Sequence, residues 1–349
     1  MRSNLSILQG RYLQDVLDQP GALNRTLENL HVSAELNTLI TKIHGNDFLR
    51  IVLTGMGSSF YALHPLTLDL IQQGYTAMML ETSELVHCQS SLFDSKTLII
   101  AVSQSGRSAE TVRLLEVNER RAAVLGITNT ADRLLARQAD AAVLTSAGEE
   151  FSVSCKTYVS TLLALKWIGD VFANRDLEVA KAGARNAASA VQSYLDCWED
   201  HVDKLTQDLK DVQRLFFVGR GASLAAAGTG ALIVKESDHF HAEGMSSAAL
   251  RHGPFEILNH QTLVVVFAGN STTANLNRRL AQDIREHRAI AELVSENAAN
   301  SPFRLPSAPE AMLSILEIIP AQMITLALAV LAGREPGRFE RVSKVTTTE

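Results

Sequence analysis

Cysteine is scarce in this chain, and so is any excess of basic residues. The 349 residues include three cysteines, Cys88, Cys155 and Cys197. An odd number of scattered cysteines argues against a disulfide framework and favours a reducing compartment. Lysine and arginine number 32 against 38 aspartates and glutamates, which gives a net charge of −6. We therefore expect no general attraction to nucleic acid or to an anionic membrane, so an anionic ligand would need local donors.

The sequence also contains no hydrophobic run that we expect to span a membrane. The N-terminal segment MRSNLSILQG contains none, and the longest apolar stretch, around residues 323–332, is too short to span a bilayer. A hydrophobic fraction of 46% and a charged fraction of 20% are those of a soluble globular protein. We expect a cytoplasmic protein that binds neither nucleic acid nor membrane.

Short apolar runs alternate with helical patterns through the first half of the chain. Two helices are expected over residues 7–44, separated at Pro20–Gly21. Buried strands with helices between them are then expected at residues 51–54, 77–80, 97–102, 123–127 and 141–144. This alternation favours an α/β fold with a parallel, doubly wound sheet that helices cover on both faces. Longer helical patterns follow over 158–171 and 177–209.

The same pattern begins again after Gln213. Setting IVLTGMGSSF over LFFVGRGASL aligns three pairs of residues, namely Gly55 with Gly219, Gly57 with Gly221 and Ser59 with Ser223. The period of about 164 residues is that of two domains in one chain. The expected parts are N-terminal helices over 1–45, a first domain over 46–175, a connecting helix over 176–210, a second domain over 211–335 and a C-terminal tail over 336–349.

A serine-rich loop, Ser103-Gln104-Ser105-Gly106-Arg107-Ser108, lies between an expected strand and an expected helix. Hydroxyls, an amide and backbone N–H groups at a helix N-terminus favour an anion such as phosphate. The alternative is a polar loop in which Ser108 only caps the helix. The corresponding loop of the second half, AGNST over 268–272, has lost most of the pattern. We therefore expect one phosphate site per chain, in the first half.

Two charges close an apolar helix in the second half. The helix after Gly221 reaches Lys235 and Glu236, and His252 follows in a Gly-Pro turn. A buried carboxylate is costly unless it is paired or used, and a carboxylate with an imidazole can perform general acid–base catalysis. The alternative is a structural ion pair of Lys235 with Glu236 and a hydrogen-bonded loop histidine.

Other cofactor and metal sites are weakly indicated. The two Gly-x-Gly turns lack the third glycine of a dinucleotide fingerprint, because Phe60 and Leu224 occupy its place. The segment His239-x-His241-x-Glu243 could hold a metal, but such pairs are usually structural. We expect no cofactor and no metal. Lys344, near the polar C-terminus, would by itself be a solvated charge.

Four motifs together resemble the tandem sugar isomerase (SIS) domain family. They are TGMGSS, SQSGRS, GALIVKESDHFHAEGMSSAALRHGP and SKVTTTE, in this order, and the similarity runs from about Leu27 to Glu349. The chain is similar to the isomerase half of glutamine:fructose-6-phosphate aminotransferase, to stand-alone glucosamine-6-phosphate deaminases and to phosphorylated Amadori-product deglycases. The resemblance implies two flavodoxin-like SIS domains.

The resemblance also implies roles for individual residues. It assigns the sugar 6-phosphate to Ser103, Gln104, Ser105 and Ser108, and it places Ser59 beside the sugar. It makes Glu236 the group that moves a proton between C1 and C2 of the open-chain sugar. His252 would open the ring of a substrate bound to the neighbouring subunit, which requires a homodimer. Lys344 would lie on a tail that closes over the sugar, where it can reach the carbonyl and form a Schiff base.

Departures from the family pattern direct the functional prediction. Arg2 stands where the cysteine nucleophile of a glutaminase domain would be, so we expect no glutaminase domain and do not expect glutamine to supply nitrogen. Ile233 and Thr229 replace a lysine and a glutamate of the family motif, which points to a different substituent at C1 or C2. Ser154 lies in a segment one residue shorter than in relatives and is a less secure sugar contact.

These inferences predict cleavage of the C–N bond of a 6-phosphorylated amino sugar or sugar-amine conjugate, as a deglycase or deaminase. One alternative is an aldose–ketose phosphate isomerase, which needs the same base but no nitrogen. An alternative of another class is a sensor that binds a sugar phosphate without reacting.

Overall fold

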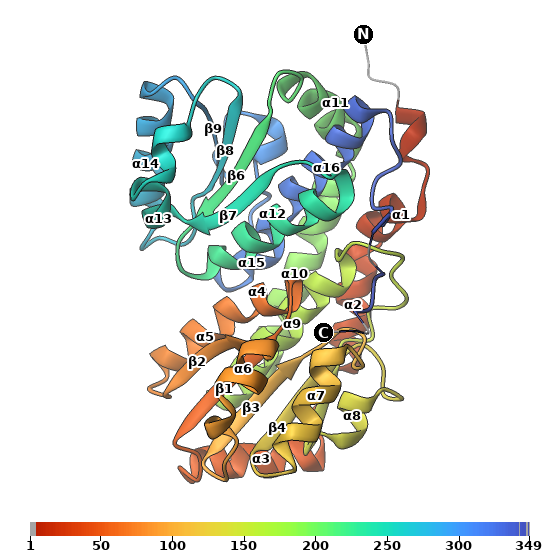
Figure 1. Ribbon diagram of the computed structural model, residues 1–349, viewed down its shortest axis with the longest axis vertical. Helices are drawn as coiled ribbons and strands as arrows, with labels where there is room; N and C mark the ends of the chain where they lie inside the picture. Colours follow the sequence, from red (N-terminus) through yellow and green to blue (C-terminus); the bar gives the residue numbers. More distant parts are fainter. Residues whose placement is uncertain (1–4, 342, 347, 349) are drawn as a thin grey trace. The chain divides into compact units, whose positions relative to one another are not determined.

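The computed structural model describes residues 5–341, 343–346 and 348 (Figure 1). The chain divides into two compact units, each with its own sheet. The first-sheet unit comprises Gly21–Glu149, Lys156–Ala184 and Arg341–Glu349, and the second-sheet unit comprises Met1–Pro20, Glu150–Cys155 and Arg185–Glu340. Each unit therefore combines a central segment with shorter segments from elsewhere in the sequence.

Five parallel strands form the first sheet, in the order β2-β1-β3-β4-β5. They are β1 (Arg50–Gly55), β2 (Ala77–Glu81), β3 (Thr97–Val102), β4 (Ala123–Thr128) and β5 (Ala141–Leu144). Each one coincides with a predicted strand to within one residue at either end. The prediction succeeds because the central strands β1, β3 and β4, buried on both faces, are continuous apolar runs, and the partly exposed outer strands β2 and β5 are also mainly apolar.

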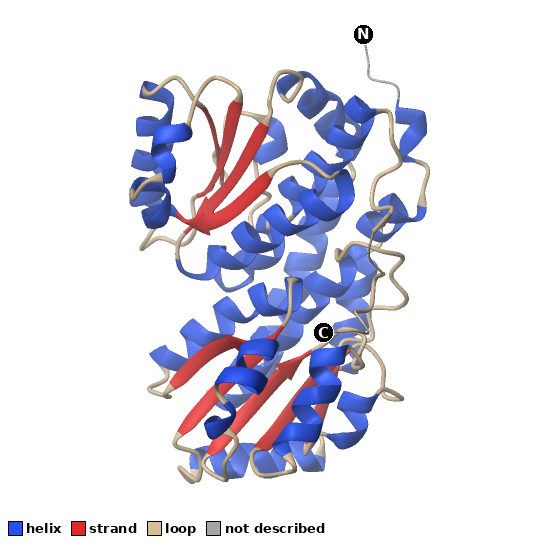
Figure 2. Ribbon diagram, in the orientation of Figure 1, coloured by secondary structure: helices blue, strands red, loops and turns tan. Residues whose placement is uncertain are grey.

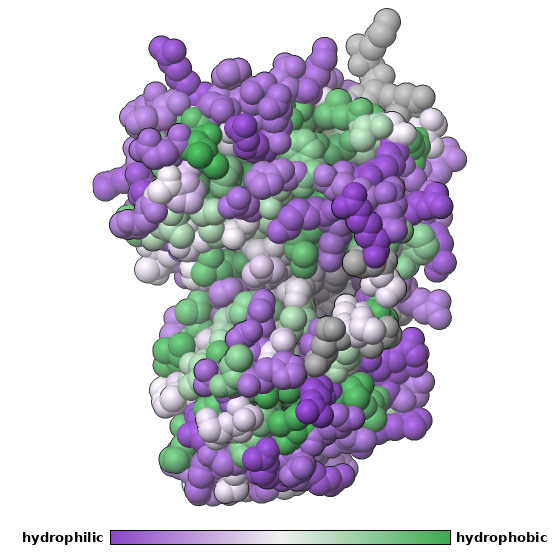
Figure 3. All heavy atoms as spheres, viewed as in Figure 1, coloured by the Kyte–Doolittle hydropathy of each residue, from purple (hydrophilic) through white to green (hydrophobic). Residues whose placement is uncertain are grey.

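Helices cover both faces of this sheet (Figure 2). On one face pack α6 (Thr82–Cys88), α7 (Ala109–Asn118) and α8 (Leu134–Gln138); the other face carries α3 (Ala34–His44), α4 (Ser58–Tyr61), α5 (Leu63–Gln72) and α9 (Lys156–Phe172). The core on the first of these faces includes Val52, Ile99, Leu85 and Leu114, all buried. Hydrophilic residues predominate on the side of the molecule shown in Figure 3, with smaller hydrophobic patches between them.

The second sheet repeats the arrangement with four parallel strands in the order β7-β6-β8-β9. They are β6 (Arg214–Gly219), β7 (Ala242–Ser246), β8 (Thr262–Phe267) and β9 (Ile290–Val294). One face carries α13 (Ser247–Arg251) and α14 (Ala274–Glu286); the other carries α11 (Trp198–Asp208), α12 (Leu224–Asp238) and α16 (Ile319–Ala332), which continues the shorter α15 (Leu313–Glu317).

The internal duplication is confirmed by backbone geometry as well as by strand order. Gly57 and Gly221 both have a positive φ, +53° and +58°, directly after the first strand of their sheets. A Cβ atom on Gly55 would lie 3.0 Å from the Ser59 carbonyl carbon, and one on Gly219 would lie 2.9 Å from the Ser223 Cβ. Both turns therefore require glycine for the same two reasons, conformation and close approach.

Two helix predictions are wrong in detail. Three α-helices, not two, precede the first strand: α1 (Arg11–Leu17), α2 (Gln19–Asn29) and α3. Pro20 and Gly21 lie inside the first turn of α2, where proline is tolerated because the N–H it lacks has no partner within the helix. The single long pattern over 177–209 is two helices, α10 (Leu177–Leu195) and α11, and Cys197 occupies the N-cap position of the second.

The apolar stretch near the C-terminus is longer than the sequence prediction. It runs over 23 residues, Glu310–Ala332, and is long and apolar enough to cross a membrane by length and composition alone. However, 83% of its most apolar window is buried inside the protein. Core helices that are buried on all sides have this composition, so its hydrophobicity is accounted for by packing against α11 and α12.

Candidate functional site

The strand order of the first sheet reverses between β1 and β3. Strand β1 pairs with β2 on one side and with β3 on the other, and Gly55 lies beside Val102 at the carboxyl ends of β1 and β3. The chain leaves β1 into α4 and α5 on one face, and leaves β3 into α7 on the other. Open parallel sheets bind ligands at such a point, outside the carboxyl ends of the strands.

The predicted phosphate-binding residues meet at this position. Ser59 lies on α4 directly after the β1 turn, and Ser103, Gln104, Ser105 and Ser108 lie on the loop between β3 and α7. All are partly or largely buried. The structure therefore brings together the part of the predicted site that belongs to the first-sheet unit.

The serine loop is held in shape by backbone hydrogen bonds within the loop and to strand β4. The Ser103 N–H donates to the Ile127 carbonyl at 3.0 Å, and the Gly106 N–H donates to the Ser103 carbonyl at 3.0 Å. Gly106 has φ +59°, and a Cβ there would lie 2.7 Å from the Cβ of Arg133. Because only glycine fits this turn, the loop keeps a fixed course into the N-terminus of α7.

Ser108 occupies the N-cap position of α7 but makes no capping hydrogen bond to the backbone. Its hydroxyl lies 2.8 Å from the Thr111 hydroxyl. The alternative in which this serine serves only as a cap therefore receives no support. Together with its neighbours, Ser108 offers side-chain donors at the positive end of a ten-residue helix.

The C-terminal tail reaches the same helix end. The Ala109 N–H, at the first position of α7, donates to the Thr346 carbonyl at 3.0 Å. Lys344 lies two residues earlier and is half-buried. This hydrogen bond joins residues 237 positions apart in the sequence, from 109 to 346, and holds a terminus that would otherwise be expected to fray.

Glu236, His252 and Ser154 belong to the second-sheet unit. Glu236 lies in the last turn of α12, half-buried, and Ser154 lies in the turn before α9, where the Cys155 N–H donates to the Glu150 carboxylate at 2.9 Å. His252 follows α13 and is exposed. Each lies on a different element of this unit.

Glu236 and His252 are separated in the chain by strand β7 and helix α13. The strand begins where Ala242 pairs with Leu215 and ends where Ser246 pairs with Gly219. Glu236 precedes the start of the strand, and His252 follows its end. Helix α12, which contains Glu236, and helix α13, which His252 follows, pack on opposite faces of the second sheet, so the sheet lies between these two helices within one chain.

A buried carboxyl group that the sequence interpretation missed lies elsewhere in the second-sheet unit. Glu317, at the end of α15, is 1% exposed, and its Oε1 accepts a hydrogen bond from the Ser223 hydroxyl at 2.8 Å. Burial raises the pKa of Glu317 to about 8. The sequence contains a signal for this group, because Glu317 is the one charged residue in the run SILEIIPAQM, whereas Glu236 stands beside Lys235.

The histidine segment considered for a metal makes other contacts. His239 Nδ1 lies 2.8 Å from Arg334 Nη1, and His241 Nε2 lies 3.4 Å from Glu243 Oε1. Within the described part of the chain, no group of three His, Cys, Asp or Glu side chains could hold a metal ion.

The chain is similar to proteins whose names refer to sugar phosphates. The SIS domain family matches residues 46–168 and 208–332. Glutamine--fructose-6-phosphate aminotransferase (isomerizing) of Pyrococcus horikoshii is 29% identical over 352 residues, which cover 97% of this chain and 57% of that protein. The chain thus spans little more than half the length of this relative.

Solved structures share the fold over nearly the whole chain. Tagatose-6-phosphate ketose/aldose isomerase from Escherichia coli has a TM-score of 0.80 at 20% identity, covering 98% of this chain and 99% of that one. Glucosamine-6-phosphate deaminase from Thermotoga maritima has a TM-score of 0.81 at 19% identity, covering 97% and 100%.

Proposed function

Because the chain belongs to the SIS domain family, with one copy of the domain around each sheet, we propose that it cleaves the C–N bond of a 6-phosphorylated amino sugar or sugar-amine conjugate. The observation that carries the proposal is the convergence of Ser59, the serine loop and the C-terminal tail at the carboxyl ends of β1 and β3, where the strand order of the first sheet reverses. A cytoplasmic location remains part of the proposal.

The phosphate group is proposed to bind the serine loop. Ser103, Ser105 and Ser108 supply hydroxyl donors and Gln104 an amide, and the N-terminus of α7 adds its partial positive charge. Because the net charge of the chain is −6, this local set of donors must attract the anion. An anchored phosphate fixes the far end of an open-chain hexose, so the reacting carbons are positioned relative to the protein.

The proposed chemical step is a proton transfer between neighbouring carbons. The Glu236 carboxylate removes a proton from the carbon that bears nitrogen, beside the carbonyl, and an enaminol forms. The proton returns to the neighbouring carbon, so that the C–N bond becomes a C=N bond. Water then adds to this imine carbon, the amine leaves with a proton, and the oxygen of water becomes the new carbonyl oxygen. The sum is substrate plus water to sugar phosphate plus amine.

A homodimer is proposed in which His252 serves the neighbouring subunit. The positions of α12, which contains Glu236, and of α13, which His252 follows, on opposite faces of the second sheet support this arrangement, because the sheet lies between these helices within one chain. The two-fold symmetry of a dimer would bring the imidazole of each chain to the carboxylate of the other.

Replacing Ser105 with alanine is expected to raise KM for the phosphorylated substrate about tenfold to a hundredfold, because a hydrogen bond to a charged group contributes about 1.5–3 kcal/mol. Initial-rate kinetics measure the change. The matched control is Ser271→Ala in the corresponding loop after β8, which should leave KM unchanged. Equal effects of the two substitutions would contradict the assignment of phosphate to the first loop.

Replacing Lys344 with methionine is expected to lower kcat/KM roughly 10²-fold, because the ammonium group near the sugar carbonyl is lost and the reacting end is less well positioned. Arg341→Met removes a charge from the same tail and serves as the control. Borohydride trapping with substrate, followed by mass spectrometry, should label the wild type and not the Lys344 variant. A variant with wild-type kcat/KM would remove Lys344 from the site.

The reaction class is tested by measuring released amine. The enzyme is incubated with glucosamine 6-phosphate and with 6-phosphorylated fructosyl- and glucosyl-amino acids. Amine release from at least one of them is the expected result, and turnover of none would overturn the proposal.

A second candidate function is aldose–ketose phosphate isomerisation, which the shared fold with the tagatose-6-phosphate isomerase favours equally. It predicts exchange of the C2 proton of glucose or fructose 6-phosphate with solvent deuterium when no amine is present. A sensor would bind these sugar phosphates with neither exchange nor amine release.

A further inference from the structure

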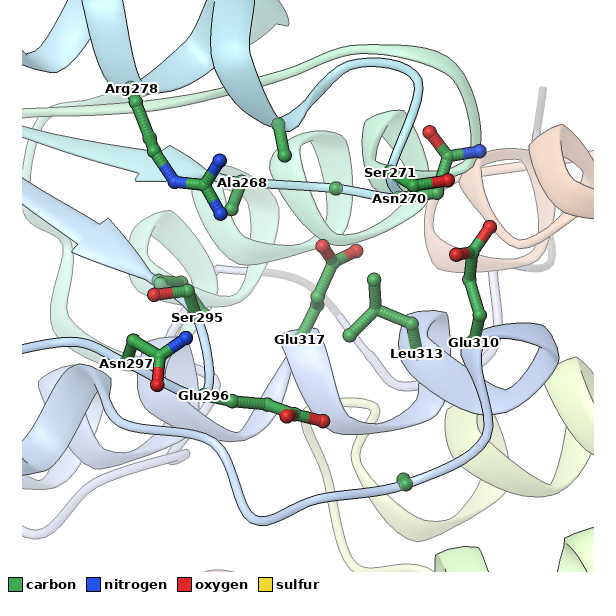
Figure 4. A pocket seen from close by; sticks show the side chains of 14 residues that line it. Ala268, Asn270, Ser271, Arg278, Ser295, Glu296, Asn297, Glu310, Leu313 and Glu317 are labelled. Atoms are coloured by element: carbon green, nitrogen blue, oxygen red, sulfur yellow. The ribbon is translucent and has the colours of Figure 1, made fainter.

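The second-sheet unit contains a cavity that the proposed reaction does not use. It measures about 230 Å³ and lies beyond the carboxyl ends of β8 and β9 (Figure 4). Its walls are the loop from Ala268 to Ser271, the start of α14, the segment Val294–Asn297 and the approach to α15. The serine loop and α7 occupy the corresponding positions in the first sheet. The duplication therefore produced two potential ligand sites, of which only the first was predicted.

The floor of this cavity is the buried carboxyl group of Glu317. Oε1 accepts the Ser223 hydrogen bond and the carboxyl group also faces the Gly269 backbone N–H, whereas Oε2 is buried and makes no hydrogen bond of good geometry to the described residues. Figure 4 shows the carboxyl group pointing from α15 into the cavity. A buried polar atom without a partner is costly, and a ligand that donates a hydrogen bond to Oε2 would remove this cost.

The charges around Glu317 favour a cation over an anion. The other ionisable side chains that line the cavity are Arg278, Glu296 and Glu310, so that around Glu317 two carboxylates face one guanidinium group. Arg278 itself donates to the Asn275 amide oxygen at 2.9 Å. The cavity is thus acidic, in contrast to the serine loop.

The N-terminus of α14 is not arranged to hold an anion in place of the missing serine pattern. The Thr273 and Ala274 N–H groups donate to the Asn270 carbonyl at 3.1 and 2.9 Å. These amides are therefore used within the loop itself. In the first sheet, by contrast, the first N–H group of α7, that of Ala109, donates to the C-terminal tail, and the N-terminus of α7 is proposed above to bind phosphate.

We propose that this cavity is a binding site for a small molecule with a primary ammonium group, which donates to Glu317 Oε2 while hydroxyl groups of the ligand contact Asn270 and Ser271. The volume is below the range of about 300–1,000 Å³ typical of drug-sized ligands, so the ligand has the size of one amino sugar or amino acid. The site is separate from the phosphosugar site and stands whether or not that proposal holds.

Binding of an ammonium group is coupled to proton release. With its pKa raised to about 8 by burial, Glu317 is protonated at neutral pH, facing Ser223, Arg278, Glu296 and Glu310. An ammonium group favours the carboxylate, so the bound state consists of the ion pair and a proton released to the buffer. A ligand without the positive charge would release none.

Isothermal titration calorimetry with D-glucosamine tests the proposal. D-Glucosamine lacks the phosphate that anchors the proposed substrate. N-acetyl-D-glucosamine is the control ligand, because it has a similar structure without the positive charge. Titrations at pH 7 in two buffers of different ionisation enthalpy should show saturable binding of glucosamine with release of nearly one proton per chain. N-acetylglucosamine should bind at least tenfold more weakly and release none.

Variants locate the binding. Glu317→Gln should weaken glucosamine at least tenfold and abolish proton release, and Glu310→Gln, at an exposed position, should weaken it without affecting the core. Ser105→Ala should change neither. Absence of saturable binding, equal binding of the acetylated sugar, or sensitivity to Ser105→Ala but not to Glu317→Gln would each overturn the inference. None of these results bears on amine release from phosphorylated substrates.

Discussion

Replacing Glu236 with glutamine is expected to lower kcat by about 10²- to 10⁴-fold while substrate binding is retained, because a positioned general base contributes about that factor. Glutamine has nearly the shape of glutamate but cannot accept the proton from carbon. Glu236 is half-buried in the last turn of α12, so the substitution should leave the fold intact. Loss of amine release and of C2 proton exchange together would show that the proton transfer itself is lost.

Binding is measured separately from turnover in this variant. Calorimetry with the sugar phosphate should give a Kd within a few-fold of the wild-type value. Lys235→Gln is the matched control, because Lys235 is the exposed neighbour on the same helix turn. If Glu236→Gln turned over substrate at the wild-type rate, Glu236 could not be the base. A wild-type protein that binds and does not turn over would favour the sensor.

Mixing two inactive variants tests the shared site. A dimer of one Glu236→Gln chain and one His252→Ala chain has one site with both groups intact and one with neither. Random exchange of subunits should therefore restore about a quarter of the wild-type activity. If the two groups acted within one chain, no mixed dimer would contain an intact site and activity would stay absent.

Most of the first sheet could be predicted because its strands are apolar runs bounded by turns, and the central strands β1, β3 and β4 are buried on both faces. The runs at 97–102 and 141–144 match β3 and β5 at both ends. The loop at Ser103–Ser108 could also be predicted, because its hydrogen-bond donors lie within six consecutive residues. Residues that are this close in sequence are also close in the structure. The duplication was equally visible, since glycine is required twice at equivalent turns.

What could not be predicted depends on contacts between distant residues. From the sequence, Pro20 is interpreted as the residue that separates two helices. In the structure α2 begins at Gln19, so Pro20 lies in its first turn, where proline is common. The hydrogen bond from the Ala109 N–H to the Thr346 carbonyl could not be predicted from the sequence of either segment. Glu236 and His252 are close in sequence, yet α12, which contains Glu236, and α13, which His252 follows, pack on opposite faces of the second sheet.

The raised pKa of Glu317 predicts how the stability of the second-sheet unit changes with pH. The side chain has a pKa of about 8 in the folded protein, against an ordinary value of 4.5 for an exposed glutamate. Between these two pH values the folded state holds a proton that the unfolded state has released, so the free energy of unfolding falls as pH rises. Below 4.5 the acid is protonated in both states, and above 8 it is ionised in both. The full loss is about 5 kcal/mol, from 3.5 pH units at 1.36 kcal/mol each.

Glu317→Gln should remove this contribution, because an amide keeps the shape of the neutral acid and does not titrate. Urea unfolding at pH 5 and pH 8 measures it, and the change in unfolding free energy between the two pH values should be several kcal/mol larger for the wild type than for the variant. Comparing the two proteins cancels other buried groups, such as Asp238 and Glu292, whose pKa values burial also raises.

Fluorescence can assign the effect to the correct unit. The chain has two tryptophans, Trp167 on α9 in the first-sheet unit and Trp198 on α11 in the second. In a Trp167→Phe background, Trp198 fluorescence should show an unfolding midpoint in urea that depends on pH. Glu317→Gln should remove this pH dependence. In a Trp198→Phe background, Trp167 should report the same midpoint with or without Glu317. Parallel pH profiles of the wild type and the Glu317 variant would mean that the carboxyl group is ionised in the folded protein. An ammonium ligand would then bind at pH 7 without releasing a proton.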